Sequence, residues 1–249
     1  MSSYNGPLSN PPAREALVDI QFEPSVPIDS IRGFEAKTRD RYEKSAPIWQ
    51  AMFGLALSSE GATPAQPSQT AIGFRLDSQK TSHVLQCRTN GFTFSRLSPY
   101  GGWQGLRAAA KAEWDALLKF VPPFTVKRIA VRYINDLKLP VQLQDFADFL
   151  SCPPEVPVGL PQGVSSFLQR VVVPDGEHNC VSIITQSLDE GPHQPNDEIN
   201  VLLDIDVFRM TNIDPSDFDK IWIGLDELRE QKNRMFFGHI TDKLVERFK

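Results

Sequence analysis

Two aspartates in one apolar segment are the residues best suited to chemistry. Between residues 199 and 208 apolar and polar side chains alternate, which places Asp204 and Asp206 together on the polar side of a strand. Two neighbouring carboxylates bind Mg²⁺ for phosphoryl chemistry or share one proton. A metal site needs a third oxygen ligand, and the candidates are Asp19, Asn135 and Asp136.

Arginines on other predicted strands offer the same carboxylates a structural role. Arg96, Arg128 and Arg132 are suited to ion pairs across neighbouring strands. We favour this interpretation and predict neither a metal nor a cofactor. The alternative is a metal-dependent phosphoester hydrolase that uses Asp204 and Asp206.

Other polar and aromatic residues are candidates for ligand binding. Arg96 shares its predicted strand face with Phe92 and Phe94, and its guanidinium is suited either to a carboxylate or phosphate ligand or to a neighbouring acid. Arg132 and Asn135 fall on opposite faces of their strand, so only one of them lines a given site. The residues predicted to bind a ligand are Arg96, Arg132, Asp204, Asp206 and Tyr100.

Sequence motifs for common catalytic sites are absent. The chain has no GxSxG, GxGxxG or GxxxxGK[ST] segment, and its four histidines form no zinc-binding pattern. We therefore predict no catalytic residues and favour a protein that is not an enzyme, while the enzymatic alternative stays open.

Composition indicates a folded globular protein. The 249 residues are 41% hydrophobic, 10% aromatic and 23% charged, which excludes disordered, collagenous and disulfide-scaffold classes. The net charge of −5 disfavours nucleic acid as a partner. No apolar stretch has the length of a membrane helix. Three cysteines without a CxxC motif predict reduced thiols and a cytoplasmic location.

The element pattern of the first half is strand, helix, three strands and long helix. Residues 1–13 read as a flexible lead-in. The predicted elements are a strand at 16–24, a helix at 27–44, strands at 70–76, 82–88 and 92–97, and a helix at 103–121. Asn90-Gly91 predicts a type I′ hairpin turn, and residues 58–68 read as a loop.

The second half repeats this order. Its predicted elements are a strand at 126–139, a short helix at 143–150, strands at 164–173, 180–188 and 199–209, and a helix from 214 to the C-terminus with a kink at Gly238. The second turn between these strands is a polar loop at 189–198.

The repeated order predicts the fold class. We expect an α+β fold of tandem duplicated βαβββα units, residues 14–123 and 124–249, joined in one compact unit. Antiparallel strands form one or two sheets, with the long helices packed on one face and the other face open. Val18 and Val131 are expected in equivalent strands about an internal twofold axis.

Five sequence blocks give the chain a family resemblance. They are PPAREALVDIQF (11–22), GFTFSRLSPY (91–100), VRYIN (131–135), LDIDVF (203–208) and KNRMFF (232–237). Together they resemble a sporadically distributed family of uncharacterised prokaryotic proteins. The resemblance implies no activity and no catalytic residue. The patchy distribution of the family implies a mobile or defence-associated gene system.

The sequence therefore favours a cytoplasmic binding or regulatory protein. We expect it to recognise a protein partner or a small ligand on the open sheet face. A second alternative is nucleic-acid binding on a saddle-like sheet, by analogy with the tandem α/β topology of TATA-box-binding proteins. The acidic net charge counts against that alternative.

Overall fold

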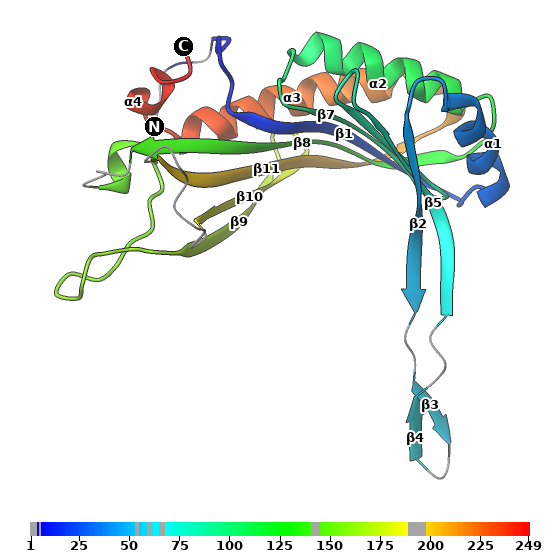
Figure 1. Ribbon diagram of the computed structural model, residues 1–249, viewed down its shortest axis with the longest axis horizontal. Coiled ribbons are helices and arrows are strands. Elements are labelled where there is room, and N and C mark those ends of the chain that lie inside the picture. The colour runs from blue at the N-terminus through cyan, green and yellow to red at the C-terminus, as the bar shows by residue number, and fades with distance from the viewer. Residues whose placement is uncertain are drawn as a thin grey trace.

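The computed structural model describes residue 4 and residues 6–52, 55–58, 61–64, 68–140, 145–188 and 198–249. Within these residues the chain has an α+β fold, with one antiparallel sheet of nine strands and four α-helices. Helices α1, α2 and α3 lie on one side of the sheet, and strands at both ends bend toward the other side (Figure 1). The predicted α+β class is therefore confirmed.

The strand order is β2-β5-β6-β7-β1-β8-β11-β10-β9. The bounds are β1 (Ala13–Glu23), β2 (Lys44–Met52), β5 (Ser68–Ser78), β6 (His83–Arg88), β7 (Gly91–Leu97), β8 (Thr125–Pro140), β9 (Phe167–Asp175), β10 (Cys180–Leu188) and β11 (Glu198–Ile213). A separate two-stranded sheet joins β3 (Leu55–Ser58) and β4 (Gly61–Pro64).

One α-helix follows β1, a second follows β7, and the last two follow β11. They are α1 (Ile28–Thr38), α2 (Trp103–Leu117), α3 (Asp219–His239) and α4 (Asp242–Val245), with 3₁₀ turns η1 (Phe146–Asp148) and η2 (Pro215–Asp217). Helix α2 contacts β1 and β7, whereas α3 contacts β8, β10 and β11. Each long helix therefore rests on strands from its own half of the chain.

The side chains of the central strands β1 and β8 alternate between the two faces of the sheet. Val18 lies opposite Val131 in their register, and both side chains are buried in the core beneath the helices. Because side chains alternate along a strand, Asp19 and Arg132 point to the other face. One residue of register thus decides which side chains join the core and which line the uncovered face.

Trp114 of α2 forms the aromatic centre of the core. Its ring meets those of Phe92 in β7 and Phe22 in β1 edge to face, with centroids 5.4 and 6.3 Å apart. Phe124 and Phe218 complete the cluster at 5.7 Å each. The side chains of Trp114 and Trp222 are both buried, as their places on the two apolar helix stripes predict.

The edge strand β2 lies where the sequence predicted the end of a helix and no strand. Helix α1 ends at Thr38 rather than at residue 44, and residues Lys44–Met52 form β2, which pairs with β5. Most side chains of β2 are exposed on both sides, so the strand lacks the alternation that identifies half-buried strands. Pro47 fits there because an edge strand leaves some backbone N–H groups unpaired.

The predicted loop at 58–68 lies partly outside the described residues. Its described parts include β4, which pairs with β3, and the start of β5. The interpretation of the whole segment as a loop is therefore wrong.

The turn between β6 and β7 differs from the prediction in its position and in its type. Arg88 pairs with Gly91, so the two turn residues are Thr89 and Asn90, one position earlier than expected. Neither residue has a positive φ, which a type I′ turn requires at both positions. The hairpin prediction is confirmed and its turn type is wrong.

The C-terminal helix is divided instead of kinked. Helix α3 ends at His239, and Ile240 is extended because it forms a β-bridge with Leu150. The Thr241 side chain then accepts a hydrogen bond from the Leu244 N–H and caps α4. A tertiary contact therefore interrupts a segment whose apolar pattern continues.

Two other predicted elements differ or lie outside the structure. The expected helix at 143–150 is represented by the 3₁₀ turn η1, and residues 141–144 lie outside the described residues. So do residues 189–197, which cover nearly all of the predicted polar loop.

The three cysteines are free thiols. No helix in the described part of the chain is long and apolar enough to cross a membrane.

Trp114→Ala tests the central role of the aromatic cluster. Removing a buried indole leaves a cavity between both halves of the core, and we expect the free energy of unfolding to fall by about 3–5 kcal/mol. Urea unfolding measures it. The matched control is Trp49→Ala in β2, where the tryptophan is 57% exposed and the expected change is within about 0.5 kcal/mol. Equal losses in the two variants would contradict this account of the core.

Candidate functional site

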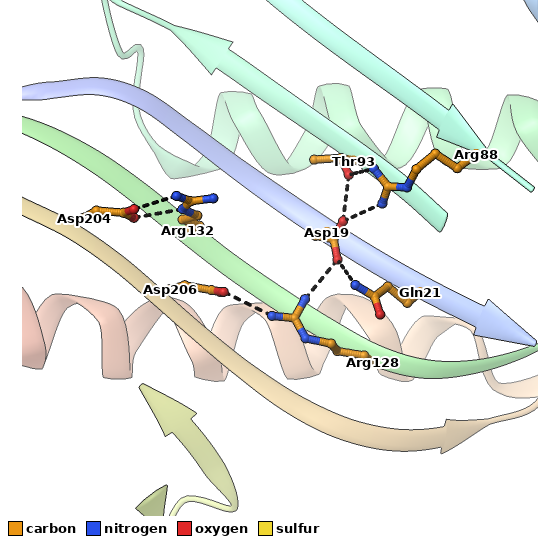
Figure 2. A network of polar contacts seen from close by, with 8 residues as sticks. All are labelled: Asp19, Gln21, Arg88, Thr93, Arg128, Arg132, Asp204 and Asp206. Carbon is orange, nitrogen blue, oxygen red and sulfur yellow. Dashed lines mark hydrogen bonds and ion pairs between the residues drawn. The ribbon is translucent and has the colours of Figure 1, made fainter. Parts of the chain in front are cut away.

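The centre of the sheet face opposite the helices, hereafter the open face, carries a network of ion pairs (Figure 2). The side chains come from five strands that are contiguous in the sheet order β6-β7-β1-β8-β11. The network consists of Asp19, Gln21, Arg88, Thr93, Arg128, Arg132, Asp204 and Asp206. Three carboxylates face three guanidinium groups, so the formal charges of the network cancel.

Asp19 in β1 is the junction of the network. Its Oδ2 accepts hydrogen bonds from Arg88 Nη2 at 3.0 Å and Thr93 Oγ1 at 2.7 Å. Its Oδ1 accepts from Arg128 Nη1 at 3.0 Å and Gln21 Nε2 at 3.2 Å. Four donors thus satisfy the hydrogen-bonding capacity of a largely buried carboxylate.

Arg128 joins the two halves of the chain across the centre of the sheet. One amino group donates to Asp19 and the other, Nη2, donates to Asp206 Oδ2 in β11 at 3.1 Å. Its guanidinium also lies over the Phe208 ring, 4.5 Å from the centroid. These contacts fix one arginine between two carboxylates and an aromatic face.

Within the network, Arg132 and Asp204 form a bidentate pair with each other. Arg132 Nε donates to Asp204 Oδ1 at 2.8 Å, and Nη2 donates to Oδ2 at 2.5 Å. The hydrogen bonds to Asp204 raise the pKa of Arg132, so the guanidinium stays charged. Its side chain is 43% exposed, which makes it the most accessible charged group of the network.

Asp206 is the member of the network whose charge is least well compensated. Its Oδ1 is buried and has no hydrogen-bond partner among the described residues. Burial raises the pKa of Asp206, while Arg128 and Arg132 lower it and the charges of Asp19 and Asp204 add to the rise. Arg128 therefore compensates only one oxygen of this carboxylate.

The geometry favours ion pairing over a metal site. Among the described residues, no three His, Cys, Asp or Glu side chains gather as a cation site requires. The three candidates for a third ligand are dispersed: Asp19 lies across Arg128 from Asp206, Asn135 donates to the Leu203 carbonyl at 2.9 Å on the other face, and Asp136 contacts Arg14.

The five predicted binding residues lie on two faces of the sheet. Arg132, Asp204 and Asp206 come together on the open face, as ion pairing between neighbouring strands predicts. Arg96 and Tyr100 do not join them. Arg96 pairs in register with the buried Ala16, and its Nε donates to the Pro99 carbonyl at 3.3 Å. The Tyr100 hydroxyl lies 2.5 Å from that of Tyr133, on the helix side.

Asp19, Arg88 and Thr93 are network residues that the sequence interpretation missed as a group. Alternation in 16–24 does place Asp19 on the polar side of its strand. Its partners are 69 and 74 positions away and belong to β6 and β7. Only the strand order reveals that β7 lies beside β1 and that β6 lies beside β7. No protein-family model matches the sequence, and no curated protein matches it.

Asp206→Asn tests the uncompensated carboxylate. Because its folded pKa is raised, the contribution of Asp206 to stability is greatest below its unfolded pKa of about 4 and falls as the pH rises through the folded pKa. Asparagine does not titrate. Urea unfolding between about pH 4 and about pH 8 should therefore show the wild type losing stability relative to the variant as the pH rises.

The matched variant is Asp204→Asn, which leaves Arg132 with one weak acceptor. We expect a loss of about 1 kcal/mol at neutral pH, because solvent screens this half-exposed pair. A stability difference between wild type and Asp206→Asn that stays constant with pH would contradict our description of Asp206.

Proposed function

We propose that the protein is a non-catalytic binding protein that recognises a partner protein on its open face. The observation that carries this proposal is an apolar margin beside the ion network. Met210 in β11 pairs in register with Arg128, and Val172 in β9 aligns through Ile183 with Asp206, so both share the face of the network. Leu168 continues this margin along β9. All three are exposed.

The composition of this surface suits a protein partner. Protein interfaces combine an apolar centre with arginine and aromatic anchors, and they are surrounded by polar groups that need not be removed from water. Here Leu168, Val172 and Met210 provide apolar area, and Arg132 provides an accessible guanidinium. The ion pairs already satisfy most charges of the network, which lowers the desolvation cost of covering it.

The same charges argue against the two alternatives. Phosphate backbones bind surplus positive charge, whereas Arg88, Arg128 and Arg132 are each held by a carboxylate. A phosphoester hydrolase would need Asp204 and Asp206 free for metal binding, and both already face arginines. We therefore propose neither nucleic-acid binding nor hydrolysis.

We also propose that the sheet arose by duplication of a βαβββα unit. Outward from the centre, one half runs β1, β7, β6, β5 and the other runs β8, β11, β10, β9, and only the edge strand β2 of the first half has no counterpart in the sheet. Val18 faces Val131 across the central pair, as a twofold axis between β1 and β8 requires. Family membership, a defence-associated setting and a cytoplasmic location stay proposals that rest on the sequence alone.

Superposing residues 14–121 on residues 126–248 tests the duplication. We expect Val18 to fall on Val131, and β5, β6 and β7 to fall on β9, β10 and β11 in that order. A best superposition that matches other strands would show that the shared element order is accidental.

Site-directed photo-crosslinking tests the proposed interface. A benzophenone amino acid at Met210 should give one discrete covalent adduct with a partner protein in the native cells, identified by mass spectrometry. The matched control is the same substitution at Ile223 of α3, on the helix side. The side chains of Met210 and Ile223 are 65% and 59% exposed, so the probe is similarly accessible at both positions.

A second change makes the result specific to the face. Adding Val172→Lys to the Met210 probe puts a charge into the apolar margin on a nearby strand and should reduce the yield of the adduct. The proposal fails if Met210 gives no adduct, or if Ile223 captures the same protein with equal yield.

A further inference from the structure

A cavity of about 430 Å³ lies on the helix side of the sheet, away from the open face. Its walls are the N-terminal segment 6–13, the loop before α2, the middle of β8 and the C-terminal half of α3. Asn10 N donates to the Phe248 carbonyl at 2.9 Å and holds the N-terminal wall in place. Gly102, with a φ of 95°, turns the chain into Trp103 at another wall. This volume suits a small organic molecule.

Lys232 is the unusual residue of this cavity. Its side chain is only 8% exposed, and its Nζ lies 3.6 Å from the centroid of the Tyr133 ring. No carboxylate among the described residues pairs with this amine. A buried ammonium without a counter-ion is costly, and the face of one tyrosine compensates only part of that cost.

The charged side chains that line the cavity are both basic. Arg229 and Lys232 both line the cavity, and none of the described lining side chains is acidic. Arg229 pairs with the neighbouring Glu230, so Lys232 is the lining cation that has no carboxylate partner among the described residues. The remaining wall is largely aromatic, including Trp103, Tyr133 and Phe236.

We propose that this cavity binds a small organic anion. The acidic group of the ligand would meet the amine of Lys232 and the guanidinium of Arg229, and its apolar body would lie against Trp103 and Phe236. The hydroxyl groups of Tyr100 and Tyr133, which bond to each other, offer additional polar contacts at the same wall. A carboxylate, sulfonate or phosphate is the matching acidic group, because each accepts charge-assisted hydrogen bonds.

The pKa of Lys232 supports the proposed anion site. The pKa of Lys232 is lowered to about 7, mostly by burial and in part by the charge of Arg229, and the charge of Glu230 opposes both effects. Burial raises the pKa of Tyr100 and of Tyr133, so both face the amine as neutral groups. Segment 6–13 contributes no titratable side chain. A bound anion would favour the charged amine, so binding above pH 7 would take up a proton.

Sequence blocks that are far apart in the chain converge on this cavity. Pro12, Tyr100, Tyr133 and Lys232 belong to four of the five blocks that carry the family resemblance, and all four line the cavity. The remaining block, LDIDVF, contributes Leu203, whose carbonyl accepts the hydrogen bond from the lining residue Asn135. Residues of these blocks thus meet at the cavity, whereas other residues of the same blocks, such as Asp19, Thr93 and Arg132, lie in the network on the open face.

Fluorescence titration with 8-anilinonaphthalene-1-sulfonate tests the proposal. This probe has an aromatic body and a sulfonate that stays ionised at every pH used. We expect saturable binding to the wild type, with an affinity that falls as the pH rises above about 7 because Lys232 loses its proton. Lys232→Met keeps the side-chain volume and should weaken binding about tenfold at neutral pH, with little remaining pH dependence.

Three controls keep the result interpretable. Lys232→Met should unfold in urea at the wild-type concentration or higher, because it removes an uncompensated buried amine. Arg229→Gln, at the rim, should weaken binding in the same direction. Met210→Glu on the open face should leave the affinity unchanged, which separates this site from the proposed protein interface. Absence of saturable binding, or equal affinity and pH dependence in Lys232→Met, would overturn the proposal.

Discussion

The antiparallel pairing of β1 with β8 is the constraint on which the rest of the structure depends. With Val18 fixed opposite Val131, strict alternation sends Asp19, Arg128 and Arg132 to the open face and Tyr133 and Asn135 to the helix side. A register shift of one residue would move the charged set into the core and the apolar set into water. The same pairing therefore builds the core, the ion network and one wall of the cavity.

Buried charges are compensated differently on the two faces of the sheet. On the open face, three carboxylates and three arginines neutralise one another, and the buried Asp206 Oδ1 lacks a hydrogen-bond partner among the described residues. On the helix side, the Lys232 amine lies over the Tyr133 ring without a carboxylate partner in the described chain. A compensated network suits a surface that a protein covers, whereas an uncompensated cation suits a cavity that a small anion enters.

Both proposals place function on elements that are packed or paired with others. The open face consists of paired strands, and the cavity lies between β8 and α3 with its N-terminal wall anchored by Asn10. The aromatic cluster around Trp114 packs α2 against the sheet, and Phe218 brings the start of α3 to the same cluster. Side chains held by such packing reach a ligand with little further loss of conformational freedom.

The sequence by itself determined most of the elements, because alternation in β1, β8, β10 and β11 and the apolar stripes of α2 and α3 are local signals. It also determined that Asp204 and Asp206 share a face opposite the buried side of β11. Only the tertiary structure decided that Arg132 and Arg128 meet them, that Asp19 joins the network and that Arg96 and Tyr100 do not. Edge strand β2 and the break at Ile240 were also decided there. The physical reason is that strand order and long-range contacts depend on which surfaces pack together, and no local periodicity records that choice.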